Sequence, residues 1–220
     1  MKLYSYYRSS SAWRVRTVLE LKGLPYEYHP TNLAPGVSEQ RAPEFASVNP
    51  LQQVPTLEWV ENGRVVRLTQ SVAIAEYLEE THPDPPLLPR EPLGRARVRQ
   101  IVELVASGIQ PLQNTGTLAR VGELSTEQRV REWAQSFISR GLFALETFAR
   151  ASGGLFAVGD HVTLADVFIV PQLYNARRFE VPLAPYPKLV EIDARAAAIP
   201  AFERAHPDRQ IDSPSQVTAR

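Results

Sequence analysis

Three consecutive hydroxyl side chains, Ser9, Ser10 and Ser11, lie where a short strand is expected to pass into a helix. Alternating aromatic residues from Lys2 to Tyr7 predict the strand, and apolar residues at helical spacing from Val15 to Leu21 predict the helix. A helix start carries unpaired backbone N–H groups and a partial positive charge, so it can stabilise an anion. Serine is also a common N-cap residue. The segment therefore predicts either an anion site or a plain helix cap.

Composition narrows the classes of function. The chain has 220 residues, 44% hydrophobic and 22% charged, as expected for a globular protein with one large or two small domains. Lys plus Arg and Asp plus Glu are equal at 24 each, so bulk charge suggests neither a nucleic-acid nor a membrane partner. There is no cysteine, so any thiol chemistry must use a thiol from another molecule.

Metal binding and export are not expected either. The four histidines show no ligand spacing, so no metal site is predicted; they are His29, His82, His161 and His206. The N-terminus has no signal-peptide pattern and no run approaches 18 uninterrupted apolar residues. A cytoplasmic location is the expectation.

Residues 1–82 are expected to form a small α/β domain, followed by a proline-rich linker at 83–93. The remaining strands are expected at 26–29, 56–60 and 65–69, with helices at 45–49 and from Ser71 to His82. Because the opening reads strand, helix, strand, its two strands should be parallel. Asn62-Gly63 predicts a hairpin between the last two strands.

Residues 94–207 are expected to form an all-helical domain, and 208–220 a loosely held polar tail. Helices are expected at about 94–121, 126–151, 164–175, 188–198 and 201–206. A hydroxyl at Thr163 and a carboxylate at Asp166 have the spacing of a capping box, which closes a helix start with its own side chains.

Several motifs together resemble the cytosolic glutathione transferases. The shared features are the βαβ-α-ββ-α order, a proline before the third strand, Gln-Ser opening the third helix, and Thr-Leu-Ala-Asp in the helical domain. More narrowly, residues 6–16 resemble the zeta-class signature Ser-Ser-Cys-x-x-Arg-Val-Arg, as do 109–114, 170–172 and 175–179. The resemblance covers Met1 to about Pro214 and implies a thioredoxin-like α/β domain followed by an all-α domain.

The zeta class includes maleylacetoacetate isomerases, which belong to aromatic amino acid catabolism. The resemblance implies glutathione-dependent cis–trans isomerisation of maleylacetoacetate, or of the related maleylpyruvate. Glutathione thiolate would add to the cis double bond, the new single bond would rotate, and the thiolate would leave. One departure is that the signature cysteine is Ser11 here. Relatives acting on maleylpyruvate also lack it, so the departure bears on the substrate more than on the reaction.

The resemblance also assigns a glutathione site. Ser9 and Ser10 are expected to stabilise the thiolate, with Ser11 as a neighbour of unassigned role. A cis peptide before Pro55 would present the Val54 backbone to the tripeptide. Further glutathione contacts are expected from Gln40, Gln70, Ser71, Gln110 and Asn114. The structural alternatives are a strand-starting proline, an N-cap serine and solvated surface amides.

A dicarboxylate substrate needs fixed cations, and arginine pairs with carboxylates bidentately. Arg8 beside the serines and Arg178 in the Asn-Ala-Arg-Arg-Phe run are the candidates, the alternative for Arg178 being a salt bridge or a solvated helix end. The nearby tyrosines are rival thiol partners that strand geometry favours as core or cleft wall; they are Tyr4, Tyr6 and Tyr7.

Two other functions remain open at this point. A general glutathione transferase, acting by conjugation, peroxide reduction or dehalogenation of small halo-acids, would keep Ser9, Pro55 and Ser71 but need no pair of arginines. A non-catalytic interaction module is the second, since this fold has also served in interaction domains. The resemblance further implies a homodimer.

Overall fold

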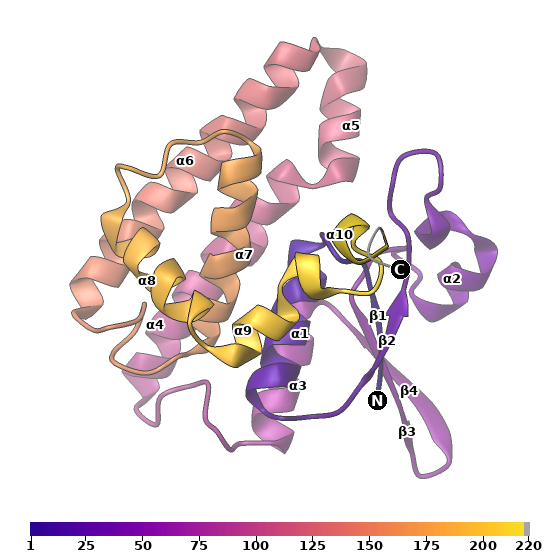
Figure 1. The fold of residues 1–220 in the computed structure, drawn as a ribbon, viewed down its shortest axis with the longest axis horizontal. Coiled ribbons are helices and arrows are strands. Elements are labelled where there is room, and N and C mark those ends of the chain that lie inside the picture. Colours follow the sequence, from indigo (N-terminus) through magenta and orange to yellow (C-terminus); the bar gives the residue numbers. More distant parts are fainter. Residues whose placement is uncertain (218–220) are drawn as a thin grey trace. The chain divides into compact units, whose positions relative to one another are not determined.

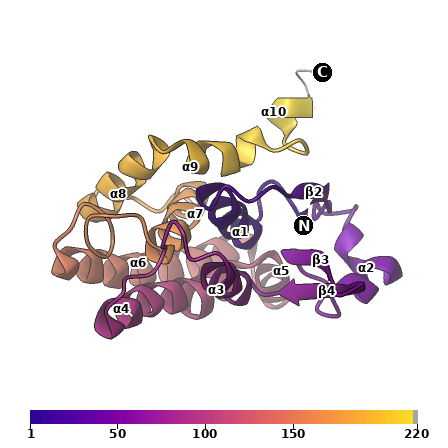
Figure 2. The ribbon, with the colours of Figure 1, turned by 90° about the horizontal axis from the view of Figure 1, so that it is seen from below.

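The computed structural model describes residues 1–217. The chain divides into two compact units, one formed by Met1–Pro85 together with the segment from Ala198 onward, the other by Pro86–Ala197. Figures 1 and 2 show the ribbon from two directions. No helix among residues 1–217 is both long and apolar enough to span a membrane.

The first unit contains a four-stranded sheet in the order β2-β1-β3-β4. The strands are β1 (Lys2–Ser5), β2 (Glu27–Pro30), β3 (Thr56–Glu61) and β4 (Arg64–Thr69). β1 pairs with β2 in parallel, and β3 pairs antiparallel with both β1 and β4. The predicted parallel pair and hairpin are both confirmed, and Asn62 and Gly63 take the positive φ angles, 50° and 73°, that a tight hairpin turn needs.

Within Met1–Pro85 three α-helices accompany the sheet: α1 (Ser10–Leu21), α2 (Pro43–Val48) and α3 (Ser71–Thr81). α1 packs against α3. Their apolar faces and the sheet enclose a core in which Leu3, Leu19, Leu57, Ile74 and Leu78 are fully buried. The expected thioredoxin-like architecture is therefore present, and the starts of α1 and α3 belong to the same unit.

The end of the chain differs from the predicted division. α9 (Pro200–Ala205) packs on α1, and the segment continues through a 3-10 turn at Pro207–Arg209 to α10 (Pro214–Val217) (Figure 1). An ion pair of 2.6 Å between Arg204 and Glu20, and an edge-on ring contact between Trp13 and His206, join the segment to the first unit. The helical domain is predicted to end at 207, with a loose tail from 208 onward. Within that tail, however, Asp212 accepts the Tyr7 N–H at 3.0 Å and the Tyr28 hydroxyl at 2.7 Å, so its described part is tied to the first unit. Residues 218–220 lie outside the described residues.

The second unit is helical throughout, as predicted. Its helices are α4 (Pro92–Glu103), α5 (Thr115–Leu124), α6 (Glu127–Ser152), α7 (Leu164–Arg178) and α8 (Pro187–Ala197). Gly141 on α6 allows a close approach, because a Cβ there would lie 2.2 Å from the Ile109 side chain.

The prediction of a single helix over 94–121 is wrong. After α4 the backbone passes through a π-helical turn at Leu104–Ile109 and a 3-10 turn at Gln110–Gln113 before α5 begins. Pro111 lacks an N–H donor, and the Asn114 side chain accepts the Gly116 N–H at 3.1 Å and caps the new helix. Both signals were present in the sequence.

Candidate active site

The start of α1 is organised by Ser9, its N-cap residue. The Ser9 N–H donates to the Tyr6 carbonyl at 2.9 Å, which closes a tight turn between β1 and the helix. The Ser9 hydroxyl oxygen accepts the Ala12 N–H at 3.2 Å, and the Ser9 carbonyl accepts the Trp13 N–H at 2.8 Å. Ser9 therefore performs the capping role that its residue type predicts.

This cap leaves donors unused. The N–H groups of Ser10 and Ser11 find no hydrogen-bond acceptor among residues 1–217, and the Ser9 hydroxyl donates to none of those residues. Ser10 is buried, with 8% of its surface exposed. An anion at this position would meet two backbone donors, a hydroxyl donor and the positive end of a helix of 12 residues.

The start of α3 lies beside α1. The buried Arg14 of α1 donates through its guanidinium to the Ser71 hydroxyl at 3.3 Å, which joins the two helices. Burial lowers the pKa of Arg14 to about 9, so the side chain stays cationic at neutral pH. Gln70, just before the helix, has a φ of +70°, a strained value for a non-glycine residue that is typical of functional sites.

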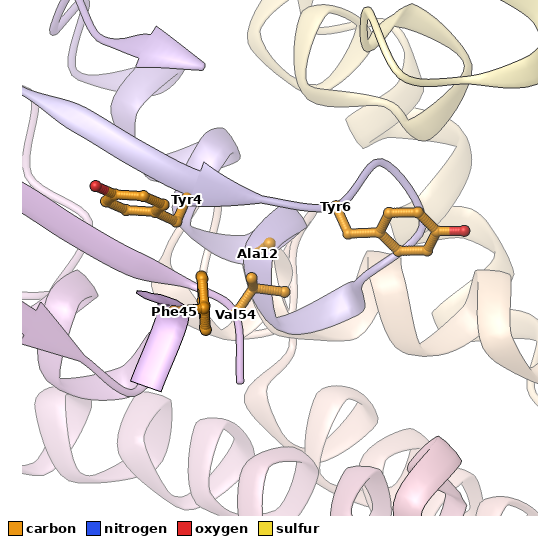
Figure 3. Close-up of a cluster of buried hydrophobic side chains, with 5 residues drawn as sticks. All are labelled: Tyr4, Tyr6, Ala12, Phe45 and Val54. Atoms are coloured by element: carbon orange, nitrogen blue, oxygen red, sulfur yellow. The ribbon is translucent and has the colours of Figure 1, made fainter. Parts of the chain in front are cut away.

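The Val54–Pro55 peptide is cis, as expected. Val54 belongs to a buried apolar cluster with Tyr4, Tyr6, Ala12 and Phe45 (Figure 3). Because Ala12 lies in the first turn of α1, this cluster places Val54 next to the serine turn. The backbone N–H and C=O of Val54 form no hydrogen bond with any residue in the described part of the chain, so this peptide can accept an extended ligand.

Gln40 supplies a further sign of a polar ligand. It lies in the 3-10 turn at Glu39–Arg41, and its side-chain oxygen is buried without a hydrogen-bond partner among residues 1–217. Buried polar atoms are normally satisfied, so an orphan of this kind fits a site completed by a bound molecule.

The rival tyrosines have other places. The Tyr4 hydroxyl points to the Glu58 carboxylate at 3.5 Å. Burial raises the pKa of Tyr6 to about 12, and its ring belongs to the buried cluster. Both fit the core role that strand geometry favours.

Arg8 is half-buried, lies 5.9 Å from the Tyr7 ring centroid and forms no ion pair with any of residues 1–217, so its charge is available to an anionic substrate.

The other predicted site residues belong to the second unit. Gln110 begins the 3-10 turn before α5. The side-chain oxygen of Asn114 accepts the Gly116 N–H in the cap described above. Arg178 is exposed at the C-terminal end of α7 and donates to the Asn175 side chain at 3.3 Å. Among residues 1–217 no three His, Asp or Glu side chains are grouped as a metal site would require.

Comparison with known proteins gives the family. Residues 3–86 match the model "Glutathione S-transferase, N-terminal domain", and residues 119–204 match "Glutathione S-transferase, C-terminal domain". Maleylacetoacetate isomerase of Mus musculus is 47% identical over 98% of this chain and 96% of its own. The crystal structure of maleylacetoacetate isomerase from Anaeromyxobacter dehalogenans is 54% identical, with a TM-score of 0.90, and covers 97% of both chains.

A maleylpyruvate isomerase described as a bacterial zeta-class glutathione transferase is 40% identical, with a TM-score of 0.90, over 97% of this chain and 100% of its own. The chain belongs to the zeta class of the glutathione transferase family. The Anaeromyxobacter enzyme carries glutathione in its active site, and a second crystal of it holds dicarboxyethyl glutathione and citrate.

In this zeta-class chain, two residues to which the sequence assigned no role contact the turn from Tyr6 to Ser9. Asp212 accepts the Tyr7 N–H at 3.0 Å, and Arg16 donates to the Tyr7 carbonyl at 2.9 Å. Arg16 was visible in the signature run but had no assigned role. Asp212 had no local signal at all, because only the fold brings it beside Tyr7.

Proposed function

We propose that this protein is a glutathione-dependent cis–trans isomerase that converts maleylacetoacetate, or the related maleylpyruvate, to the fumaryl isomer. The observation that carries the proposal is the open start of α1, with donors for an anion beside an unpaired peptide at Val54, in a zeta-class chain with no cysteine of its own. Close relatives bear the names of these two isomerases.

The first unit fits glutathione along its length. The Val54 peptide would pair with the tripeptide backbone as an added strand, and the start of α3 at Gln70 and Ser71 would hold a carboxylate. The orphaned oxygen of Gln40 would gain a donor. Gln110 and Asn114 remain proposed contacts from the second unit.

Glutathione, when bound, would supply the thiolate that adds reversibly to the cis double bond and lets it rotate. A free thiol titrates near pH ~8.5, so lowering its pKa by about two units requires roughly 2.7 kcal/mol of differential stabilisation. The Ser9 hydroxyl and the N–H groups of Ser10 and Ser11 would provide it, because they have no other acceptor among residues 1–217. Ser10 would add a second hydroxyl.

Arg8 and Arg178 are proposed to bind the carboxylates of the substrate. Replacing either with glutamine should raise KM for the dicarboxylate about 10-fold or more, since a charge-assisted hydrogen bond contributes roughly 1.5 to 3 kcal/mol. The affinity for glutathione, measured by calorimetry, should stay within about 2-fold. An unchanged KM in both variants would remove the arginines from the substrate site.

The deciding experiment compares substrates. Purified protein with glutathione should isomerise maleylacetoacetate or maleylpyruvate far faster than it conjugates an aryl halide. A conjugation rate well above isomerisation would favour the general transferase. Absence of glutathione binding at millimolar concentration would favour the interaction module.

A homodimer and a cytoplasmic location are also proposed, on the resemblance to the cytosolic transferases. Light scattering should give about twice the 24.6 kDa mass of one chain. A monomeric mass would contradict the dimer.

A further inference from the structure

The turn that delivers the chain into α1 is held by a buried cation that the proposed chemistry does not use. Arg16 is fully buried, and its guanidinium donates to the Tyr6 carbonyl at 3.3 Å and the Tyr7 carbonyl at 2.9 Å. It also donates to the Ser5 hydroxyl at 3.0 Å and the Ala205 carbonyl at 3.1 Å. One side chain therefore binds β1, the turn and the end of α9 at once.

The same turn is held from the C-terminal segment by Asp212. One oxygen of this half-buried carboxylate accepts the Tyr7 N–H at 3.0 Å, and the other accepts the Tyr28 hydroxyl at 2.7 Å. Burial raises the pKa of Tyr28, so its hydroxyl remains a donor through the neutral range. Both oxygens of Asp212 thus have a defined partner.

The two side chains bind the backbone of the same residue, Tyr7, one at its N–H and the other at its carbonyl. Arg16 takes the Tyr7 carbonyl and Asp212 takes the Tyr7 N–H, so both polar groups of Tyr7 are occupied. The Tyr6 carbonyl that Arg16 binds is also the acceptor for the Ser9 N–H. The orientation of the Ser9 cap therefore depends on the same contacts. Burial lowers the pKa of Arg16, and the charge of Asp212 opposes that shift.

We propose that Asp212 and Arg16 are positioning residues that hold the turn from Tyr6 to Ser9, so that the C-terminal segment is a working part of the glutathione site. This inference rests on the proposed function, because the group to be positioned is the thiolate-stabilising start of α1. Neither residue has to touch the substrate. Their effect is on where the Ser9 hydroxyl and the open N–H groups point.

The test separates hydrogen-bond geometry from charge. In Asp212→Asn the amide can still accept the Tyr7 N–H and can donate to the Tyr28 oxygen, so both contacts survive without the negative charge. Asp212→Ala removes both contacts. Arg204→Gln is the matched control, because it cuts another tether of the same segment, the ion pair with Glu20, without touching the turn.

Two measurements are made on each variant. The pKa of the bound glutathione thiol is obtained from its ultraviolet absorbance as a function of pH, and hydrogen exchange is followed in peptides covering Tyr6 to Trp13. Asp212→Ala should raise the thiol pKa by about one unit, which is a 10-fold loss of thiolate below that pKa, lower kcat in proportion with KM for the dicarboxylate little changed, and speed exchange in these peptides. Asp212→Asn should restore most of both signals, and Arg204→Gln should resemble the wild type.

The opposite results overturn the inference. Unchanged exchange and thiol pKa in Asp212→Ala would show that the turn holds itself, and equal effects in Asp212→Asn and Asp212→Ala would show that charge, and not geometry, matters. If Arg204→Gln had an effect as large as that of Asp212→Ala, attachment of the C-terminal segment in general, and not the contacts of Asp212 with the turn, would be what matters. If Asp212→Ala does not fold, Tyr28→Phe replaces it, with a smaller shift expected in the same direction. If the wild type binds no glutathione, the proposed function fails, and the exchange measurement still decides the positioning role.

Discussion

The starts of α1 and α7 are each capped by a hydroxyl residue, Ser9 and Thr163, but their remaining N–H donors have different partners. At α7 the Asp166 carboxylate accepts the N–H groups of Thr163 and Ala157, both at 2.8 Å, and the Thr163 hydroxyl at 3.0 Å. The next donor, the Leu164 N–H, is bound by the Leu87 carbonyl at 2.9 Å. At α1 the first-turn donors of Ser10 and Ser11 find no acceptor in residues 1–217.

The difference teaches that a capping residue does not by itself define a binding site. What matters is whether the protein brings its own acceptors to the remaining donors. At α7 the Asp166 carboxylate is an internal anion at the helix start, whereas α1 has no acidic residue in its first turn and stays open to an anion from another molecule.

The largest effect is expected from removing Asp166, the internal anion at the start of α7. Asp166→Ala would leave two N–H donors without a partner, each at a cost of about 1 to 3 kcal/mol, so the free energy of unfolding should fall by about 3 kcal/mol or more. Urea denaturation followed by circular dichroism measures this. Asp160→Ala is the matched control, because among residues 1–217 Asp160 accepts only the exposed Leu155 N–H, and its loss should cost less than about 1 kcal/mol. Equal losses in the two variants would contradict the assignment.

Removing the hydroxyls from the open start of α1 should lower activity and leave the fold largely intact. In the double variant Ser9→Ala, Ser10→Ala the bound thiol should lose most of its stabilisation, its pKa should rise by about two units, and isomerisation should fall about 100-fold. The lost cap should lower the free energy of unfolding by only about 1 kcal/mol. An isomerisation rate equal to that of the wild type would mean that these serines do not stabilise the thiolate.

The start of α7 should also make the free energy of unfolding depend on pH. Burial raises the pKa of Asp166 to about 6, above the value of about 4 expected in the unfolded chain. The folded state therefore holds this proton more tightly, and the free energy of unfolding should fall as pH rises from about 4 to about 6, by roughly 3 kcal/mol, and then level off. The measurement is the stability of the wild type relative to Asp166→Asn at each pH. Parallel curves would show that Asp166 does not titrate in this range.

The smallest expected effect is that of the Ser10 backbone N–H, which two substitutions separate from the Ser10 hydroxyl. Ser10→Ala and Ser10→Pro both remove the hydroxyl, but only proline removes the N–H, and proline is tolerated at the first helical position after an extended residue such as Ser9. The proline variant should show a thiol pKa about one unit higher than the alanine variant, a roughly 10-fold difference in thiolate below that pKa. Identical pKa values would assign the stabilisation to hydroxyl groups alone.

Much of this molecule was predictable from local patterns. The hairpin at Asn62-Gly63, the capping box at Thr163 and the start of α1 at the serines are set by residues adjacent in sequence, whose conformational preferences act over a few bonds. The interruption of the helix expected over 94–121 could also have been predicted, because Pro111 removes a donor there and Asn114 offers a cap.

What the sequence determined by itself was the chemistry on offer: a hydroxyl run at a helix start, no thiol, a cis-proline context and an arginine beside the serines. Only the tertiary structure decided which donors stay open and which residues hold them in place. Asp212 and Tyr7 are 205 positions apart, and Arg14 meets Ser71 across 57. Hydrogen bonds of that range depend on the packing of the whole unit, because no local preference can select a partner so distant along the chain.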